Sequence, residues 1–175
     1  DDIHTLYIKK GTAATVNTYT NWGIVCCKPP FKVGGETKEL PKRDWPDEHG
    51  EDTYIPSRLF LKAYDDDFEF AYKGEELAEN PFDLDLAFTQ INNFRLWLSG
   101  NDSVQDGVGS GAELKIYSPF TTIGRQGVYF LSFSDEEPIV MTKYEAGNDY
   151  HENVVTFKVK FRVTDPVTNI TLIEQ

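Results

Sequence analysis

The segment NVVTFKVKFRV, residues Asn153–Val163, decides the fold. Successive side chains of a β-strand point to opposite faces of the sheet, so a regular apolar and polar alternation marks a strand with one buried face. This segment therefore predicts a long antiparallel strand with one face in the core and one in water. The core face would hold Val155, Phe157, Val159, Phe161 and Val163, and the solvated face Thr156, Lys158, Lys160 and Arg162.

Outward from this strand, most of the chain also favours β-structure. β-Branched and aromatic residues gather in short runs that are bounded by Gly, Pro, Asn and Asp, the pattern typical of strands and turns. The expected strands are 3–8, 12–20, 22–27, 58–73, 112–118, 128–134 and 139–144, with a short strand or arm at 170–173.

The expected strand at 58–73 contains a break. Leu59, Leu61 and Ala63 share one face, whereas the apolar face further along is carried by Phe68 and its even-numbered neighbours. Because the side-chain period of a strand is two, this change of phase across Asp65–Asp67 predicts a bulge or a tight turn there.

One helix is expected at about 81–99. Asn80 fits an N-cap, Pro81 fits the first helical position, and Gly100 fits a left-handed stop. Apolar residues recur between them every three to four positions, so the helix, about 28 Å long at roughly 1.5 Å per residue, should pack on a sheet. The apolar positions are Leu84, Ala87, Phe88, Ile91, Phe94 and Leu98, with Arg95 at the edge of the stripe.

These elements predict a mainly β (α+β) fold, in which two packed antiparallel sheets form a β-sandwich with one flanking helix. The length of 175 residues indicates a single domain, 1–175, with a long loop or arm at about 28–57 and a short C-terminal tail at 166–175. Gly34-Gly35 is the expected turn of that arm. No run approaches the roughly 20 apolar residues of a membrane span.

Charge and cysteine content narrow the function classes. The formal net charge of -12 argues against a surface that grips nucleic acid phosphates, and suits a basic partner or a wall that repels DNA. The two cysteines, Cys26 and Cys27, are adjacent and too close for a relaxed disulfide, so one is expected inside and one outside. Free thiols fit a reducing compartment.

The stretch ELPKRDWPDEHGEDTYIPSR, Glu39–Arg58, is the candidate functional segment. It is acidic, it is stiffened by three prolines, and it carries its own aromatic side chains. Long loops of this kind in a small domain are usually functional. The candidate interface residues are Arg43, Asp44, Trp45, Asp47, Glu48, His49, Glu51, Asp52 and Tyr54.

Other chemistry is disfavoured by the residue types. His49 among carboxylates lacks the further His or Cys ligands that zinc usually takes, and Asp65–Asp67 lack the spacing and glycine of a calcium loop. Glu69 and Glu113 lie on expected strands, but nothing in the sequence pairs them as hydrolase carboxylates. No nucleophile elbow, phosphate loop, HExxH or CxxC motif occurs. No enzyme activity, catalytic residue, metal or cofactor is therefore predicted.

The order of parts resembles the N-terminal domain of phage distal tail proteins. The matching segments are LPKRDWPDEHGEDTYIP before a strand pair, a helix ending NNFRLWLSG, the strand region GAELKIYSPF and the final strand FKVKFRVTDP. The likeness is one of layout and loose motifs, and it covers roughly Leu40 to Pro166. The acidic insert Asp44–Asp52 stands where the family has a compact glycine turn. The 175 residues also include no counterpart of the carbohydrate-binding domain that some members of the family carry.

The resemblance implies a β-sandwich with a flanking helix, six copies of which form a ring between tail tube and baseplate. The expected partners are further copies of the chain and other tail or baseplate proteins, while DNA passes without being bound. The resemblance implies a prophage tail component, and the expected location is a virion tail assembled in the bacterial host cytoplasm. Two alternatives stay open. One is a carbohydrate- or surface-binding module that stacks sugars on Trp45, Tyr54 and Tyr129, and the other is a tail-tube or tail-completion protein.

Overall fold

The chain folds around one antiparallel sheet, and the computed structural model describes residues 4–31, 34–73, 84–101, 113–133, 139–144 and 151–173. Eight strands form this sheet. Seven of them lie in the order β2-β1-β7-β8-β10-β6-β3, and the eighth, β9, pairs with the first part of β10, whereas β8 pairs with the last part. The strands are β1 (Tyr7–Lys10), β2 (Val16–Asn17), β3 (Ile24–Cys26), β6 (Tyr64–Tyr72), β7 (Leu114–Ser118), β8 (Ile123–Phe133), β9 (Ile139–Tyr144) and β10 (His151–Val163). The two remaining strands, β4 (Lys42–Arg43) and β5 (Asp52–Thr53), form a separate pair.

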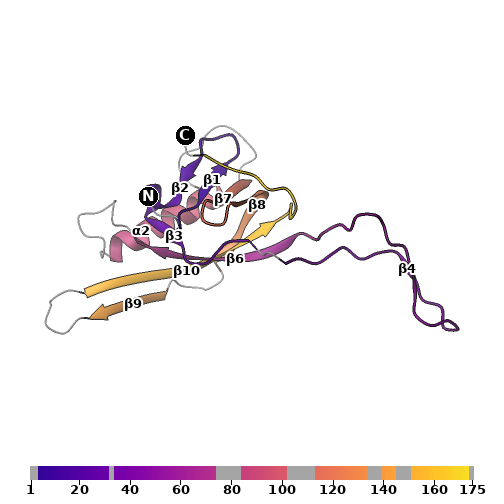
Figure 1. Cartoon of the computed structure of the whole chain (residues 1–175). Helices are drawn as coiled ribbons and strands as arrows, with labels where there is room; N and C mark the ends of the chain where they lie inside the picture. The colour runs from indigo at the N-terminus through magenta and orange to yellow at the C-terminus, as the bar shows by residue number, and fades with distance from the viewer. Residues whose placement is uncertain are drawn as a thin grey trace.

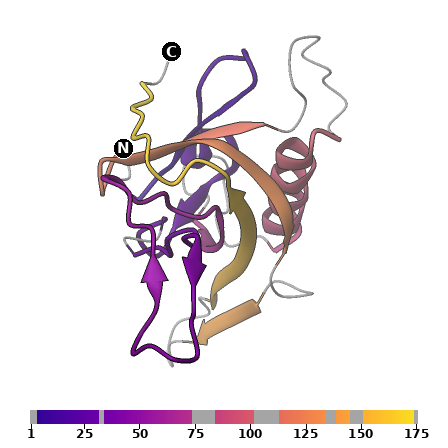
Figure 2. The ribbon, with the colours of Figure 1, turned by 90° about the vertical axis from the view of Figure 1, so that its right-hand side faces the viewer.

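The mainly β, sheet-packed fold predicted from the sequence is confirmed. The two expected layers, however, belong to a single sheet that curls on itself rather than to two separate sheets (Figures 1 and 2). The ends of the curled sheet meet where the backbone N–H of Cys26, in β3, donates to the carbonyl of His4, just before β1, at 2.9 Å. This closure satisfies part of the edge that β3 would otherwise expose.

β10 has the alternation that the sequence predicts. Val155, Phe157, Val159, Phe161 and Val163 are buried, and the side chains between them are exposed or half-buried. β10 pairs with β6 from Val155↔Tyr72 to Val163↔Tyr64, and on its other side with β8 and β9. It therefore lies at the centre of the sheet.

The bulge or tight turn predicted at Asp65–Asp67 in β6 is wrong. β6 runs unbroken from Tyr64 to Tyr72, and Asp66 takes an inward position in phase with Phe68 and Phe70. The apolar residues of 58–63 lie outside the strand, so they do not share a face with it. The apparent flip arose because these residues belong to a separate segment, and the carboxylate of Asp66 at a core position moved its apparent place into the strand.

The helix α2 (Leu84–Ser99) covers the inner face of the sheet, where Ala87, Ile91, Phe94 and Leu98 are buried. The ring of Phe94 lies 5.5 Å from that of Phe70 in β6 and 6.3 Å from that of Phe157 in β10. Phe88, expected in the apolar stripe, is exposed. The expected helix start at Asn80–Pro81 falls outside the described residues.

A second helix, α1 (Thr18–Trp22), replaces part of the expected strands at 12–20 and 22–27. The Asn17 side chain caps it by accepting from the N–H groups of Tyr19 and Thr20. Gly23, with φ of 67°, ends it in the left-handed region. Trp22 then packs on Phe94 and Trp97 of α2, with both ring distances at 5.1 Å.

The C-terminal tail forms no strand in 164–173 and is held against β8 by hydrogen bonds. The Ile170 N–H donates to the Gly124 carbonyl, and the Gly124 N–H donates to the Asn169 side chain. The tail turns at Asp165, whose carboxylate accepts from the N–H groups of Val167 and Thr168. These hydrogen bonds, that of Thr168 foremost, lower the pKa of Asp165 to about 2.

Gly124→Ala should detach this tail. A Cβ at Gly124 would lie 2.2 Å from the Ile170 carbonyl oxygen, so the tail or the strand must shift. We expect a loss of about 1–3 kcal/mol in the free energy of unfolding, together with faster hydrogen exchange at Ile170. Gly35→Ala is the matched control, because nothing lies within 4 Å of its Cβ. Equal stability of the two variants would contradict this packing.

The cysteines divide as expected, since Cys26 is buried and Cys27 is exposed. Burial raises the pKa of Cys26 to about 12 and also raises the pKa of Cys27. An aromatic disulfide reagent near pH 8 should label one thiol per folded chain, and both after unfolding. Cys27→Ser should abolish the labelling of the folded chain. Labelling of that variant at the wild-type rate would place Cys26 at the surface instead.

Candidate functional site

The segment predicted to be functional is a projecting arm. β3 and β6 are antiparallel neighbours, and the chain between them leaves the body, turns and returns as a two-stranded extension of the same hairpin (Figures 1 and 2). We define the arm as residues 36–62. Its turn is at 44–51, so the expected turn at Gly34-Gly35 is wrong.

Few contacts hold the arm together. At its base, Thr37 pairs with Leu61, and Lys62 lies 3.6 Å from Glu36 in an ion pair. Near its end, β4 pairs with β5 through Lys42↔Thr53 and Arg43↔Asp52. Apart from the half-buried Thr53, the residues of these pairs are exposed to water, where a single ion pair adds little stability.

The two sides of the arm differ in length. Between its base pair, Thr37↔Leu61, and the pair Lys42↔Thr53, the outgoing side has four residues, 38–41, and the returning side has seven, 54–60. The surplus on the returning side prevents a continuous ladder. The arm is therefore an irregular ribbon rather than a long regular hairpin.

The end of the arm, residues 44–52, is its acidic tip. It contains five carboxylates and no Lys or Arg. The Glu48 N–H donates to the Trp45 carbonyl, and Gly50 has φ of 76°, which favours glycine. The Lys42 ammonium lies 3.6 Å from Glu51, which leaves the other carboxylates of the tip pointing into solvent.

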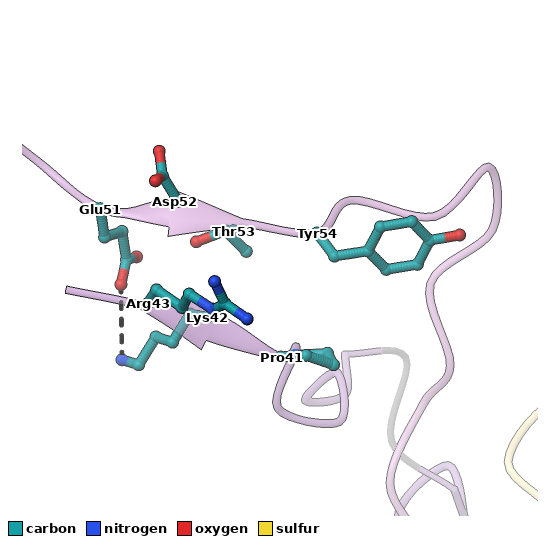
Figure 3. A pocket seen from close by; sticks show the side chains of 7 residues that line it. All are labelled: Pro41, Lys42, Arg43, Glu51, Asp52, Thr53 and Tyr54. Carbon is teal, nitrogen blue, oxygen red and sulfur yellow. Dashed lines mark ion pairs between the residues drawn. The ribbon is translucent and has the colours of Figure 1, made fainter. Parts of the chain in front are cut away.

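A hollow of about 550 Å³ lies along β4 and β5 (Figure 3). The Lys42–Glu51 ion pair stands at one end of it, and the Tyr54 ring and Pro41 stand at the other. Because only two strands line it, the hollow is an open surface and not an enclosed cavity. It suits contact with another polymer chain better than the sequestering of a small molecule. Its lining residues are Pro41, Lys42, Arg43, Glu51, Asp52, Thr53 and Tyr54.

All nine sequence-predicted interface residues lie on the exposed arm. Arg43, Glu51, Asp52 and Tyr54 share the hollow, whereas the other five lie in the turn. Within the described ranges, no three His, Cys, Asp or Glu side chains come together in a way that could hold a metal ion. No helix of the described residues is long and apolar enough to cross a membrane.

Sequence reasoning missed the apolar part of the site. Ile55, Leu59, Phe60 and Leu61 are exposed on the returning side of the arm, although 58–63 looks like the start of a buried strand. The change of phase before Phe68 was the available signal. It separates an apolar surface on the arm from the core strand that follows.

Comparison of the chain with protein-family models, with curated proteins and with solved structures finds no match. The geometry of the arm and of the sheet is therefore the basis for a functional proposal.

Trp45→Ala should leave the monomer folded. Trp45 is 46% exposed, so we expect its removal to change the free energy of unfolding by less than about 0.5 kcal/mol. Phe94→Ala, which removes a fully buried ring, should cost about 3–5 kcal/mol. Denaturant titrations of both variants at a concentration where the chain is monomeric check this. A loss for Trp45→Ala as large as that for Phe94→Ala would make Trp45 part of the core.

Proposed function

We propose that this chain is a structural subunit that assembles with its own copies through the arm. In this proposal it forms a ring of the phage distal tail type between a tail tube and a baseplate. Six copies per ring, and neighbouring tail or baseplate proteins as partners, follow from the sequence resemblance. The role is architectural, with no catalytic step and no cofactor.

One observation carries the proposal: the arm has no core of its own. None of the residues 34–63 is buried. A two-stranded hairpin is at best marginally stable in water, and exposed apolar surface of this extent is typical of interaction sites. Six large apolar side chains of the arm are exposed: Trp45, Tyr54, Ile55, Leu59, Phe60 and Leu61.

The position of the arm favours a ring over a two-fold dimer. The arm leaves one side of the body, and the hairpin of β9 and β10 extends to the other side (Figure 1). An arm that docks on a different surface of the next copy makes a head-to-tail contact, and head-to-tail contacts close into rings or continue as filaments.

The charge of the chain suits a ring through which DNA passes. A net charge of -12 repels the phosphates of a duplex, so DNA would not adhere to the wall of the channel. The same charge also explains why a nucleic-acid-binding role is disfavoured.

A carbohydrate-binding module is the second candidate, favoured by the exposed rings of Trp45 and Tyr54 on the arm. Aromatic faces of this kind can stack on sugars. Tyr129, the third ring named for this role, lies in β8 of the body rather than on the arm. The rings are therefore divided between two parts of the molecule.

Replacing residues 38–60 with a short Gly-Ser turn should separate assembly from folding. The body should melt within about 2 °C of the full-length chain measured as a monomer, because no residue of the arm is buried. Light scattering should give a ring mass for the full-length chain and a monomer mass for the armless variant. Class averages in electron microscopy should show six-fold rings for the full-length chain alone.

Two results would overturn the proposal. One is a full-length chain that stays monomeric up to high micromolar concentration, especially if it binds glycans on an array. The other is an armless variant that assembles as the full-length chain does.

A further inference from the structure

The outer face of the sheet carries a regular pattern of charge pairs. In β10 and β6 the directly opposed residues have opposite signs: Lys158↔Glu69, Lys160↔Asp67 and Arg162↔Asp65. The Arg162 guanidinium lies 2.9 Å from the Asp65 carboxylate. Opposed pairs of unlike charge stabilise a sheet. The charges on this half of the outer face are therefore compensated by other charges of the same chain.

The other half of the same face breaks this pattern. Lys9 of β1 stands directly opposite Lys115 of β7, and both side chains are half-buried. Like charges in this position are destabilising. In the described part of the chain, no ion pair joins either lysine to a carboxylate. The carboxylate in the same neighbourhood is that of Glu113, which lies just before β7 and lines a hollow together with Lys115.

An aromatic pair lies next to the lysines. Tyr7 stands opposite Tyr117, with ring centroids 6.3 Å apart and planes at 8°. We call these four residues, Tyr7, Lys9, Lys115 and Tyr117, the β1–β7 patch. It presents two cations beside a flat aromatic surface.

A hollow of about 210 Å³ adjoins the patch and is lined by Gly11, Thr12, Glu113 and Lys115. The hollow is open to solvent and has charged side chains in its lining, so it differs from the enclosed apolar cavities that bind benzene, but its volume leaves room for a side chain. The surface near the lysines is therefore shaped to receive a side chain.

We propose that the β1–β7 patch is the acceptor for the acidic tip of the arm from a second copy of this chain. Carboxylates at Asp44 and Asp47 would compensate Lys9 and Lys115, and the Trp45 ring between those carboxylates in sequence would pack on the tyrosines or in the hollow. The inference rests on the proposed function, and it names the surface that the arm contacts.

Three observations favour a second copy as the occupant. The tip carries negative charges that would compensate the two lysines of the patch, and it places an aromatic side chain between two acidic residues. The arm points away from β1 and β7 of its own chain (Figures 1 and 2), so contact must be between copies. Tip and patch are also different surfaces of one chain, as a ring requires.

Lys9→Glu with Lys115→Glu tests the acceptor. We expect the dissociation constant of assembly to rise at least about tenfold, because attraction between patch and tip becomes repulsion. Arg95→Glu with Lys73→Glu is the control: it makes the same change in net charge at two exposed positions outside the patch and outside the opposed charge pairs of β6 and β10, and assembly should persist. Sedimentation velocity at several concentrations measures both. The variant Lys9→Gln with Lys115→Gln gives a second reading if the glutamates impair folding.

Mixing gives a direct test of the pairing. A tip variant (Asp44→Lys, Trp45→Ala, Asp47→Lys) keeps its acceptor, and the Lys9→Glu, Lys115→Glu variant keeps its tip. Each should be monomeric alone, and the mixture should form a one-to-one dimer, since only one contact can be made.

The outcomes separate the two proposals. A wild-type chain that stays monomeric overturns the proposed function and this inference with it. A wild-type chain that assembles while the patch variant assembles equally well, or a mixture that stays monomeric, overturns the acceptor alone.

Discussion

The pairing of β6 with β10 is the constraint on which the rest of the structure depends. It runs without interruption from Val155↔Tyr72 to Val163↔Tyr64. Its inner face supplies the phenylalanines on which α2 packs, through Phe94, and its outer face supplies the compensated charge pairs. β6 also begins where the arm ends, so the register that fixes the core fixes the base of the arm. In the proposed assembly, folding and docking would thus depend on the same ladder.

The parts of the fold that local sequence determines were predictable. The alternation of β10 and the three-to-four spacing before Gly100 are properties of single segments. The closure of one curled sheet was not predictable, because the contact of Cys26 with His4 depends on how distant segments pair. In β6, the inward Asp66 resembles a break in the sequence pattern, since a carboxylate stands where an apolar residue is expected.

The candidate site was predictable in composition but not in form. Prolines, acids and Trp45 marked the arm as a functional segment. Its strands β4 and β5 have two residues each, which is too short for any periodic signal. The apolar residues Leu59 and Leu61 looked like core because their spacing of two residues is typical of one face of a strand. The opposition of Lys9 and Lys115 exists only through the β1–β7 register, and nothing near either lysine in the sequence reveals it.

The unequal sides of the arm have a consequence for how such assemblies diversify. The base pair Thr37↔Leu61 and the pair Lys42↔Thr53 are joined by stretches of different length, so the arm tolerates irregular insertions that a continuous ladder would reject. Close to the turn, where β4 and β5 do pair, the length of the arm can change only in steps that preserve the strand register. Two residues added to each strand extend it by about 7 Å and keep every side chain on its face, whereas one residue turns them all over. The arm is thus a spacer of adjustable length, and in rings of the proposed kind a change in the arm would alter the subunit spacing while the body stays the same.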